Sequence, residues 1–239
     1  MFRFLCLNSL IAINTIFFCL LALPLSFFDK NGRMVHFYIA VPWAKVILWI
    51  CGIKIRLTGV ENVNVGVPCI YMSNHQSYFD IFALLACLPV DFKFIVKQEL
   101  MRLPLFGAAM KRAGYIGIER ENPRKAILSM RHAAEKIQKG ASVLIFPEGT
   151  RSSDGKLQPL KKGGFKLALS SHRDIIPVAI KNSCLITPKG SLKINKGSFE
   201  MHIGKAIPVG DYSKKSIMQL IDRVSGTIRE QIDNVDIDR

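Results

Sequence analysis

A long uncharged stretch lies near the start of the chain. Phe4 to Phe28 contains no charged residue in 25 positions, and about 20 apolar residues are enough for a helix to cross a bilayer. A second apolar segment, Met34 to Ile53, carries its large apolar side chains near helical spacing. It also contains two tryptophans, which favour the headgroup level of a membrane. The residues between the segments, Asp29 to Arg33, form a polar turn.

This pattern predicts a helical hairpin over residues 1–53 that inserts into, or lies along, one leaflet of a membrane. Two alternatives stay open. The first is a cleaved signal peptide, although the stretch is longer than a usual apolar core and has no clear small-x-small cleavage site before Phe27. The second is a single anchor followed by a core helix. Arg3 on one flank and Lys30 and Arg33 on the other leave the orientation undecided.

After Ile53, short apolar segments alternate with segments of helical periodicity. Several of the short segments are apolar throughout, which is typical of strands that are buried on both faces. The predicted strands are residues 54–60, 69–73, 92–96, 115–118, 143–146, 175–180 and 199–203. The alternation predicts an α/β domain over residues 54–239, with a central, mostly parallel or mixed sheet flanked by helices.

Caps and apolar stripes predict the helices of this domain. Asn122 and Pro123 are typical of a helix N-terminus, and Gly140 is typical of the residue that follows a helix. A second helix is expected over about residues 162–171. A C-terminal helix has one apolar face from Ile217 to Ile228, which favours packing on the core over binding to a membrane.

The composition narrows the class of protein. Lys and Arg number 33 against 18 Asp and Glu, a formal charge of +15, and apolar residues make up 49% of the chain. So high an apolar fraction excludes a disordered chain. A mean hydropathy of +0.24 in so basic a chain favours a protein that associates with anionic lipid, with nucleic acid as the rival partner. The six cysteines lack zinc spacing, so we expect no metal site, reduced thiols and a cytoplasmic catalytic face.

A histidine and an aspartate follow the second predicted strand. Asn74 to Asp80 reads NHQSYFD, and an apolar helix is expected to begin at Phe79. Histidine transfers protons near neutral pH, and a carboxylate on one ring nitrogen fixes its tautomer. Five helical residues advance about 500°, so His75 and Asp80 meet only if His75 lies before the helix and folds back. A polar capping turn with a solvated Asp80 is the alternative.

Two further segments place charge at strand ends. Phe146 to Arg151 reads FPEGTR directly after a predicted strand, where α/β proteins carry their binding sites. Arg151 offers a planar guanidinium that suits phosphate, and Thr150 offers a hydroxyl. Gly114 to Arg120 reads GYIGIER and brings Arg120 to a strand end. The alternatives are an ordinary loop with a weak Glu–Arg pair and a solvated arginine. The chain has no glycine-rich nucleotide motif.

In this order, the segments resemble the motifs of the glycerolipid acyltransferase family of the PlsC type, the 1-acyl-sn-glycerol-3-phosphate acyltransferases. NHQSYFD resembles the N-H-x4-D motif, GYIGIER the G-x-[IV]-x-[IV]-x-R strand, and FPEGTR matches the third motif at all six positions. Ile175 to Val178 resembles the proline motif, and VKQEL from Val96 resembles the A-K-x-E-L segment. The resemblance covers about residues 50–210. The second motif departs from the family at Gly117 and Glu119, where Phe and Asp are usual.

The resemblance implies the glycerolipid acyltransferase fold and a reaction. A fatty acyl group would pass from a thioester donor, acyl-CoA or acyl carrier protein, to the sn-2 hydroxyl of 1-acyl-sn-glycerol-3-phosphate, giving phosphatidic acid. His75 would be the general base and Asp80 its orienting partner. The substrate site would comprise Lys97, Arg120, Glu148, Gly149, Thr150 and Arg151, with the two arginines on the acceptor's phosphate.

The resemblance also implies partners and a location. They are the lysophosphatidate acceptor, the donor and an anionic membrane surface, at the inner (plasma) membrane with the catalytic domain on the cytoplasmic side. No nucleic acid, cofactor or metal is expected, and the donor acts as a co-substrate. Two other readings remain: a family member acting on another lysolipid, and a non-enzymatic basic protein that binds membranes.

Overall fold

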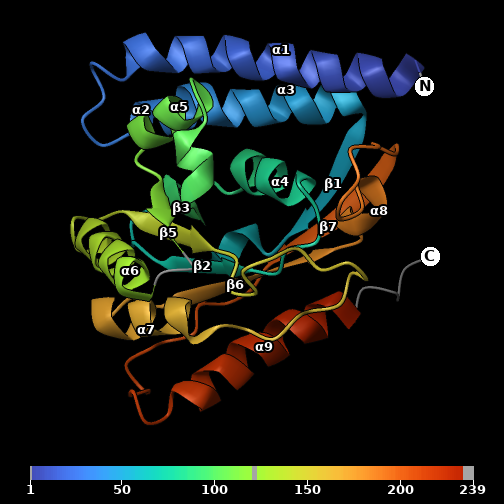
Figure 1. Cartoon of the computed structure of the whole chain (residues 1–239). Coiled ribbons are helices and arrows are strands. Elements are labelled where there is room, and N and C mark those ends of the chain that lie inside the picture. The colour runs from blue at the N-terminus through green and yellow to red at the C-terminus, as the bar shows by residue number, and fades with distance from the viewer. Residues whose placement is uncertain (1, 120–122, 234–239) are drawn as a thin grey trace.

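The computed structural model describes residues 2–119 and 123–233, and its centre is a seven-stranded sheet (Figure 1). The predicted Asn122 cap lies outside these residues. The strands are β1 (Ile53–Thr58), β2 (Ile70–Ser73), β3 (Phe92–Lys97), β4 (Ile116–Ile118), β5 (Ser142–Ile145), β6 (Ile175–Lys181) and β7 (Gly197–Ile203). Their order is β1-β7-β6-β2-β5-β3-β4. β2 to β6 run parallel, β7 is antiparallel to β6, and β1 is parallel to β7. The predicted mixed sheet and its seven strands are confirmed.

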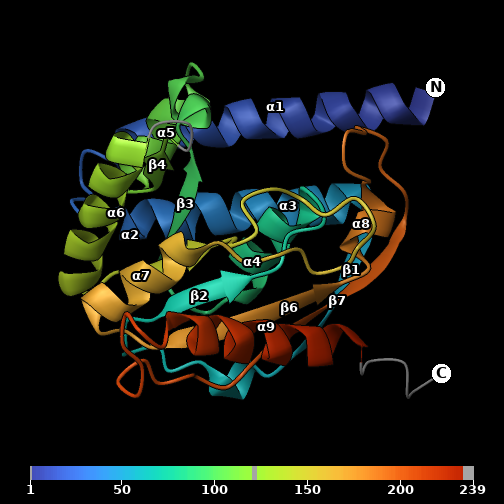
Figure 2. The same ribbon diagram turned by 60° about the horizontal axis from the view of Figure 1, so that its bottom comes forward.

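Helices cover both faces of the sheet (Figures 1 and 2). One face carries α3 (Val41–Cys51) and α4 (Phe79–Cys87), and the other carries α6 (Pro123–Gln138), α7 (Lys162–Ser171) and α9 (Ile217–Asp233). The short helices α5 (Phe106–Arg112) and α8 (Ser183–Ile186) lie at the edges. The apolar face of α9 is buried against the sheet, as predicted.

The central strands are apolar over most of their length because both of their faces are covered. On β2, the ring of Tyr71 packs in the α3 and α4 layer, whereas Ile70 and Met72 pack in the α6, α7 and α9 layer. The same alternation holds on β5, where Leu144 faces α4 and Val143 faces the opposite layer. Successive side chains of a strand point to opposite faces, so a strand between two helical layers needs apolar residues at every position.

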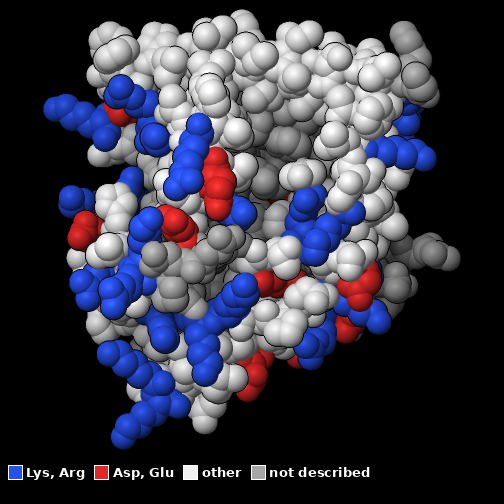
Figure 3. Space-filling view, in the orientation of Figure 1, with Lys and Arg blue, Asp and Glu red and all other residues white. Residues whose placement is uncertain are grey.

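The N-terminal segments form the predicted hairpin of two antiparallel helices (Figure 1). α1 (Phe2–Leu25) is followed by a turn, the short α2 (Arg33–Val35), a π-helical turn (His36–Ala40) and α3. The spans Arg3–Leu25 and Arg33–Cys51 are long and apolar enough to cross a membrane. Figure 3 shows an uncharged band where α1 lies. α3 packs against α4 and belongs to the core of the sheet domain, so the hairpin and that domain share apolar contacts.

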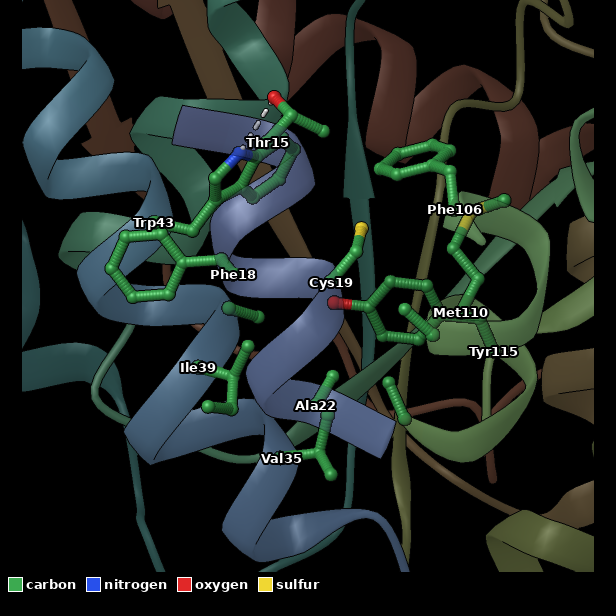
Figure 4. A pocket seen from close by; sticks show the side chains of 13 residues that line it. Thr15, Phe18, Cys19, Ala22, Val35, Ile39, Trp43, Phe106, Met110 and Tyr115 are labelled. Carbon is green, nitrogen blue, oxygen red and sulfur yellow. Dashed lines mark hydrogen bonds between the residues drawn. The ribbon is translucent and has the colours of Figure 1, made fainter. Parts of the chain in front are cut away.

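A small apolar cavity lies between α1, α3 and α5 (Figure 4). The indole N–H of Trp43 donates to the hydroxyl of Thr15 at 3.1 Å beside this cavity and ties α3 to α1. The cavity has a volume of about 60 Å³, and its accessible wall is apolar. The buried hydroxyl of Tyr115 has no hydrogen-bond partner among the described residues. The middle of the hairpin is therefore less completely packed than the sheet.

The turn of the hairpin is docked against α5 through a glycine. Gly32 has a φ of 71°, and a Cβ at this position would lie 2.5 Å from the carbonyl carbon and oxygen of Ala113. The carboxylate of Asp29 accepts the backbone N–H groups of Arg33 at 3.1 Å and Val35 at 2.7 Å. The turn is thus ordered internally and held closely against the end of α5.

We expect Gly32→Ala to destabilise the protein more than Gly52→Ala. Both glycines have positive φ, but a Cβ at Gly52 would meet nothing within 4 Å. Each substitution incurs roughly 1–2 kcal/mol for a left-handed residue, and the clash at Gly32 adds roughly 1–3 kcal/mol. Thermal unfolding of both variants in detergent measures the difference. Equal losses of stability would contradict the docking of the turn.

Candidate active site

A buried carboxylate organises the loop between β2 and α4. Asp80 lies in the first turn of α4, and its side chain is 0% exposed. One of its oxygens, Oδ2, accepts the backbone N–H groups of Gln76 at 2.7 Å and Ser77 at 2.9 Å. These bonds replace part of the hydration that a buried carboxylate loses, so the chain before the helix curls around Asp80. The other oxygen, Oδ1, is buried and has no hydrogen-bond partner among the described residues.

The imidazole of His75 is the third group on the same oxygen. Its Nδ1 lies 2.8 Å from Oδ2 of Asp80, as predicted for a histidine that precedes the helix and folds back. Because a carboxylate accepts hydrogen bonds, the neutral form of the ring that fits this contact has its proton on Nδ1 and its lone pair on Nε2. Nε2 has no partner among the described residues, and the His75 side chain is 14% exposed. A reacting group can therefore reach Nε2.

The ring of His75 is also held by stacking. Its centroid lies 3.9 Å from that of Phe146, and the two planes are inclined by 16°. Phe146 directly follows β5, which pairs with β2 in parallel register. The carboxyl ends of these two strands therefore bring the two motifs together, as α/β sites require.

Hydrogen bonds to main-chain groups of distant segments fix the backbone around the histidine. The side-chain amide of Asn74 donates to the carbonyl of Ile180 and accepts its N–H, both at 2.7 Å. The N–H of Ser152 donates to the carbonyl of His75 at 2.7 Å. Asn74 thus continues the pairing of β2 with β6 beyond the strand, and the loop after β5 is anchored to His75 itself.

Glu148 connects the two motifs through its carboxylate. Oε1 accepts the backbone N–H of His75 at 2.6 Å, and Oε2 accepts that of Gln158 at 2.8 Å. The side chain is buried, and burial raises the pKa of the carboxyl to about 7, although these two N–H groups pull it downward. The negative charges of Asp80 and Asp154 raise the pKa further. Glu148 therefore braces the histidine loop.

Arg151 stacks on an aromatic ring of the histidine loop. Its guanidinium carbon lies 3.7 Å from the ring centroid of Tyr78, a cation–π contact. The Nη1 atom of Arg151 is buried and has no hydrogen-bond partner among the described residues. A planar guanidinium with an unpartnered donor, held against the histidine loop by Tyr78, is suited to an anionic group of a substrate.

The other predicted site residues are less closely connected to the pair. Gly149 has a φ of 76°, and its N–H donates to the carbonyl of Phe146 at 3.0 Å, so this N–H is engaged within the turn. Thr150 is exposed. Lys97 ends β3 at the same edge of the sheet, where its amine lies 3.5 Å from Glu99 and is half exposed. Arg120 lies outside the described residues.

Sequence reasoning missed three residues that shape the site. Phe146 and Tyr78 lie within the quoted motifs, but only their spatial neighbours reveal the ring under His75 and the ring under Arg151. Gln158 carries no motif and contributes a backbone N–H, which every residue except proline has. In the described part of the chain, no group of three or more His, Cys, Asp or Glu side chains could hold a metal ion.

Fold and site together define an α/β protein with a histidine–aspartate pair at the carboxyl edge of its sheet. The model of the acyltransferase family matches residues 54–181, which is more than half of the chain. The chain belongs to the acyltransferase family, as its motifs predicted.

Individual relatives agree with this family. A chloroplastic 1-acyl-sn-glycerol-3-phosphate acyltransferase, BAT2 of Brassica napus, is 37% identical over 87% of this chain, and the chain spans 59% of that protein's length. The 1-acyl-sn-glycerol-3-phosphate acyltransferase of Borreliella burgdorferi is 31% identical over 74% of this chain and 72% of its own. The crystal structure of the 1-acyl-sn-glycerophosphate acyltransferase PlsC from Thermotoga maritima matches with a TM-score of 0.85 at 22% identity. It covers 99% of this chain and 95% of its own, and it confirms the fold.

Glu148→Gln should reduce the pH dependence of stability. The pKa of Glu148 in the folded protein, about 7, is above the ordinary value of 4.5, so the folded protein binds this proton more tightly than the unfolded chain. Its contribution to the free energy of unfolding is therefore fully present at low pH and is lost as the pH rises through about 7. Glutamine does not ionise and lacks this loss.

Denaturant unfolding between about pH 5 and about pH 7 measures the effect. The variant should lose less stability than the wild type over this interval. Glu230→Gln, an exposed substitution on α9, controls for the removal of a carboxylate and should follow the wild type. Parallel profiles for Glu148→Gln and the wild type would contradict the assignment.

Proposed function

We propose that the protein transfers a fatty acyl group from a thioester donor to the sn-2 hydroxyl of 1-acyl-sn-glycerol-3-phosphate, giving phosphatidic acid. The observation that carries the proposal is the pairing of His75 Nδ1 with Asp80 at 2.8 Å, which leaves Nε2 open. A neutral imidazole oriented in this way is a general base for a hydroxyl. The names of the relatives support the choice of acceptor.

The reaction is a direct transfer in two stages. Nε2 of His75 takes the proton of the sn-2 hydroxyl while the oxygen attacks the thioester carbonyl. The tetrahedral intermediate then collapses, the carbon–sulfur bond breaks, and the imidazolium returns the proton to the leaving thiolate. Asp80 stabilises the imidazolium through Nδ1–H. Such general-base assistance contributes roughly 10²–10⁴-fold. The six cysteines and Ser77 are not required as nucleophiles.

Arg151 would hold the phosphate of the acceptor. It directly precedes Ser152, whose backbone N–H is hydrogen-bonded to the carbonyl of His75. The Nη1 of Arg151 has no hydrogen-bond partner among the described residues. Arg120 would be a second cation for this phosphate, and Thr150 would contribute a hydroxyl. Lys97 would stabilise the negative charge that develops on the tetrahedral intermediate. Glu148 and Gly149 would act through the shape of the loop, as positioning residues.

The hairpin would seat the site at the surface of a membrane. The acceptor and the product are lipids, whereas acyl-CoA or acyl carrier protein arrives from water. α1 presents an uncharged face beside a strongly basic domain (Figure 3), which suits an anionic leaflet such as the cytoplasmic side of the inner (plasma) membrane. The donor serves as a co-substrate, and the proposed chemistry uses no cofactor, metal or nucleic acid.

Wild-type protein in detergent micelles should convert lysophosphatidate and oleoyl-CoA to phosphatidate, and His75→Ala should lower the rate by roughly 10²–10⁴-fold. Asp80→Asn should also lower kcat strongly, because an amide holds the wrong tautomer. His202→Ala, on β7 outside the loop, is the matched control and should keep the wild-type rate. Labelled phosphatidate is the readout, and equal rates for wild type and His75→Ala would overturn the mechanism.

The same assay separates the possible substrates. Acyl carrier protein replaces CoA as the carrier in one arm, and lysophosphatidylcholine replaces lysophosphatidate in another. Faster transfer to lysophosphatidylcholine would favour a different lysolipid as the acceptor.

Arg151→Lys should raise the KM for lysophosphatidate about tenfold, with a smaller effect on kcat. Lysine keeps the charge but loses the planar fork and the stacking on Tyr78. Tyr78→Phe retains the ring under the guanidinium and should behave like the wild type. A KM for lysophosphatidate that is unchanged in Arg151→Lys would exclude Arg151 from the phosphate site.

A further inference from the structure

A polar hollow, distinct from the small apolar cavity of the hairpin, lies far from the histidine loop. Its volume is about 570 Å³. It opens at the amino ends of the parallel strands, beside Pro68, Asp91 and Gly114, which precede β2, β3 and β4, and beside Ser142, the first residue of β5. His75 follows the carboxyl end of β2, so the hollow and the proposed acyltransferase site lie at opposite edges of the sheet.

The hollow is strongly basic. The described residues that line it include seven Lys and Arg but only two carboxylates, Asp91 and Glu135. Asp91 is already paired, because its Oδ1 lies 2.7 Å from the buried amine of Lys93. The remaining cations therefore outnumber the negative charge around them and create a positive potential in the hollow.

Three separate elements bring these cations together. Lys30 and Arg33 come from the hairpin turn, Lys111 and Arg112 from the end of α5, and Lys136 and Lys139 from the end of α6. The turn and α5 are held together by the contact of Gly32 with the backbone of Ala113. The cluster is thus built by tertiary packing and is not simply a run of basic residues.

The pKa of Lys136 is affected by burial and by the neighbouring positive charges. Its amine donates to the carbonyl of Gly114 at 2.8 Å. Burial lowers the pKa of Lys136, and the positive charges of Lys93 and Lys139 lower it further. A bound anion would offset this repulsion.

The surroundings of the hollow resemble those of a site at the surface of a membrane. Phe27 and Phe28, just before Lys30, are 76% and 81% exposed, and the guanidinium of Arg112 lies over the ring of Phe27 at 5.5 Å. Exposed aromatic rings next to cations are typical of a membrane interface. In Figure 3, basic side chains gather on the left, directly below the uncharged band that contains α1.

We propose that this hollow binds a phosphate group, carried by the headgroup of an anionic phospholipid or by free phosphate, at a site separate from the acyltransferase site. The exposed rings and the uncharged band favour the lipid as the source. A lipid held here would fix the turn of the hairpin at the membrane surface and so set the height of the sheet above it.

Lysine acetylation followed by mass spectrometry tests the site on the full-length protein. The reporters are Lys111 and Lys139, which are exposed and line the hollow. The controls are Lys193 and Lys196, which are also exposed. Their loop is held near the other end of α1, where the amide of Asn8 donates to the carbonyl of Leu192 at 3.3 Å. Both pairs therefore lie near the hairpin, and only the first lines the hollow.

Three conditions are compared: phosphatidylcholine vesicles, the same vesicles with one part in three phosphatidylglycerol, and phosphatidylcholine vesicles with excess inorganic phosphate at matched ionic strength. Phosphatidylglycerol should slow the acetylation of Lys111 and Lys139 roughly fivefold and leave the control pair nearly unchanged. Equal slowing by inorganic phosphate would assign the phosphate group itself, and slowing only by phosphatidylglycerol would assign the lipid. Unchanged reporters, or equal slowing of both pairs, would overturn the proposal.

A matched pair of charge-removing variants gives an independent test. Lys111→Gln/Lys139→Gln and Lys193→Gln/Lys196→Gln remove the same charge from exposed positions. Sedimentation with vesicles containing phosphatidylglycerol should show a roughly fivefold or greater weakening for the first variant and a small change for the second. Acyl transfer in micelles should stay at the wild-type rate in both. Equal weakening would mean that only total charge matters and would overturn a discrete site.

Discussion

The carboxylate of Asp80 is the group on which the geometry of the loop between β2 and α4 depends. A fully buried charge is costly unless hydrogen-bond donors offset the loss of water. Three donors meet one oxygen, Oδ2, whereas Oδ1 is buried without a partner among the described residues. Two of the three donors are backbone N–H groups, so the loop can satisfy Asp80 only by curling back over the start of α4. That curl brings the imidazole of His75 into the third position, with Nε2 facing outward. The orientation of His75, the proposed base, is thus a consequence of how the chain compensates a buried charge.

The position of His75 also depends on hydrogen bonds between segments that are distant in the chain. Glu148 bonds the backbone of His75 across 73 positions, and Asn74 bonds Ile180 across 106. Both connections exist because β2 is paired with β5 on one side and with β6 on the other. The loops after β2 and β5 are bonded to each other, and the first is also bonded to strand β6, so the ring of His75 is held between Asp80 and Phe146. Positioning of this kind allows a single base to be effective.

The two ends of the sheet have different relations to the hairpin. At the amino edge, the docked turn of the hairpin joins α5 and α6 in surrounding the basic hollow. At the carboxyl edge, the loops carry the proposed chemistry. α3 packs in the same apolar core as α4 and β2. The hairpin is therefore in contact with the two elements that flank the histidine loop. The position of α1 relative to a membrane would therefore also determine the position of His75.

Much of this architecture follows from the sequence. Strands buried on both faces form nearly continuous apolar runs, so β2, β5 and β6 are recognisable without any partner. The stripe of α9 and the length of α1 are equally local properties. His75 and Asp80 also belong to one short segment, and helix geometry alone states the condition under which they meet.

Tertiary structure decided the features that join distant segments. The stacking of Phe146 on His75, the two-sided bonding of Glu148 and the gathering of cations from the turn, α5 and α6 depend on strand order and loop paths. No periodicity in the chain encodes these, because the contacts join residues whose separation in sequence is arbitrary. The sequence by itself determined which elements form and which residues are the candidates for the chemistry. Only the packed sheet decided which side chains lie together, since parallel pairing brings the ends of non-consecutive strands to one edge.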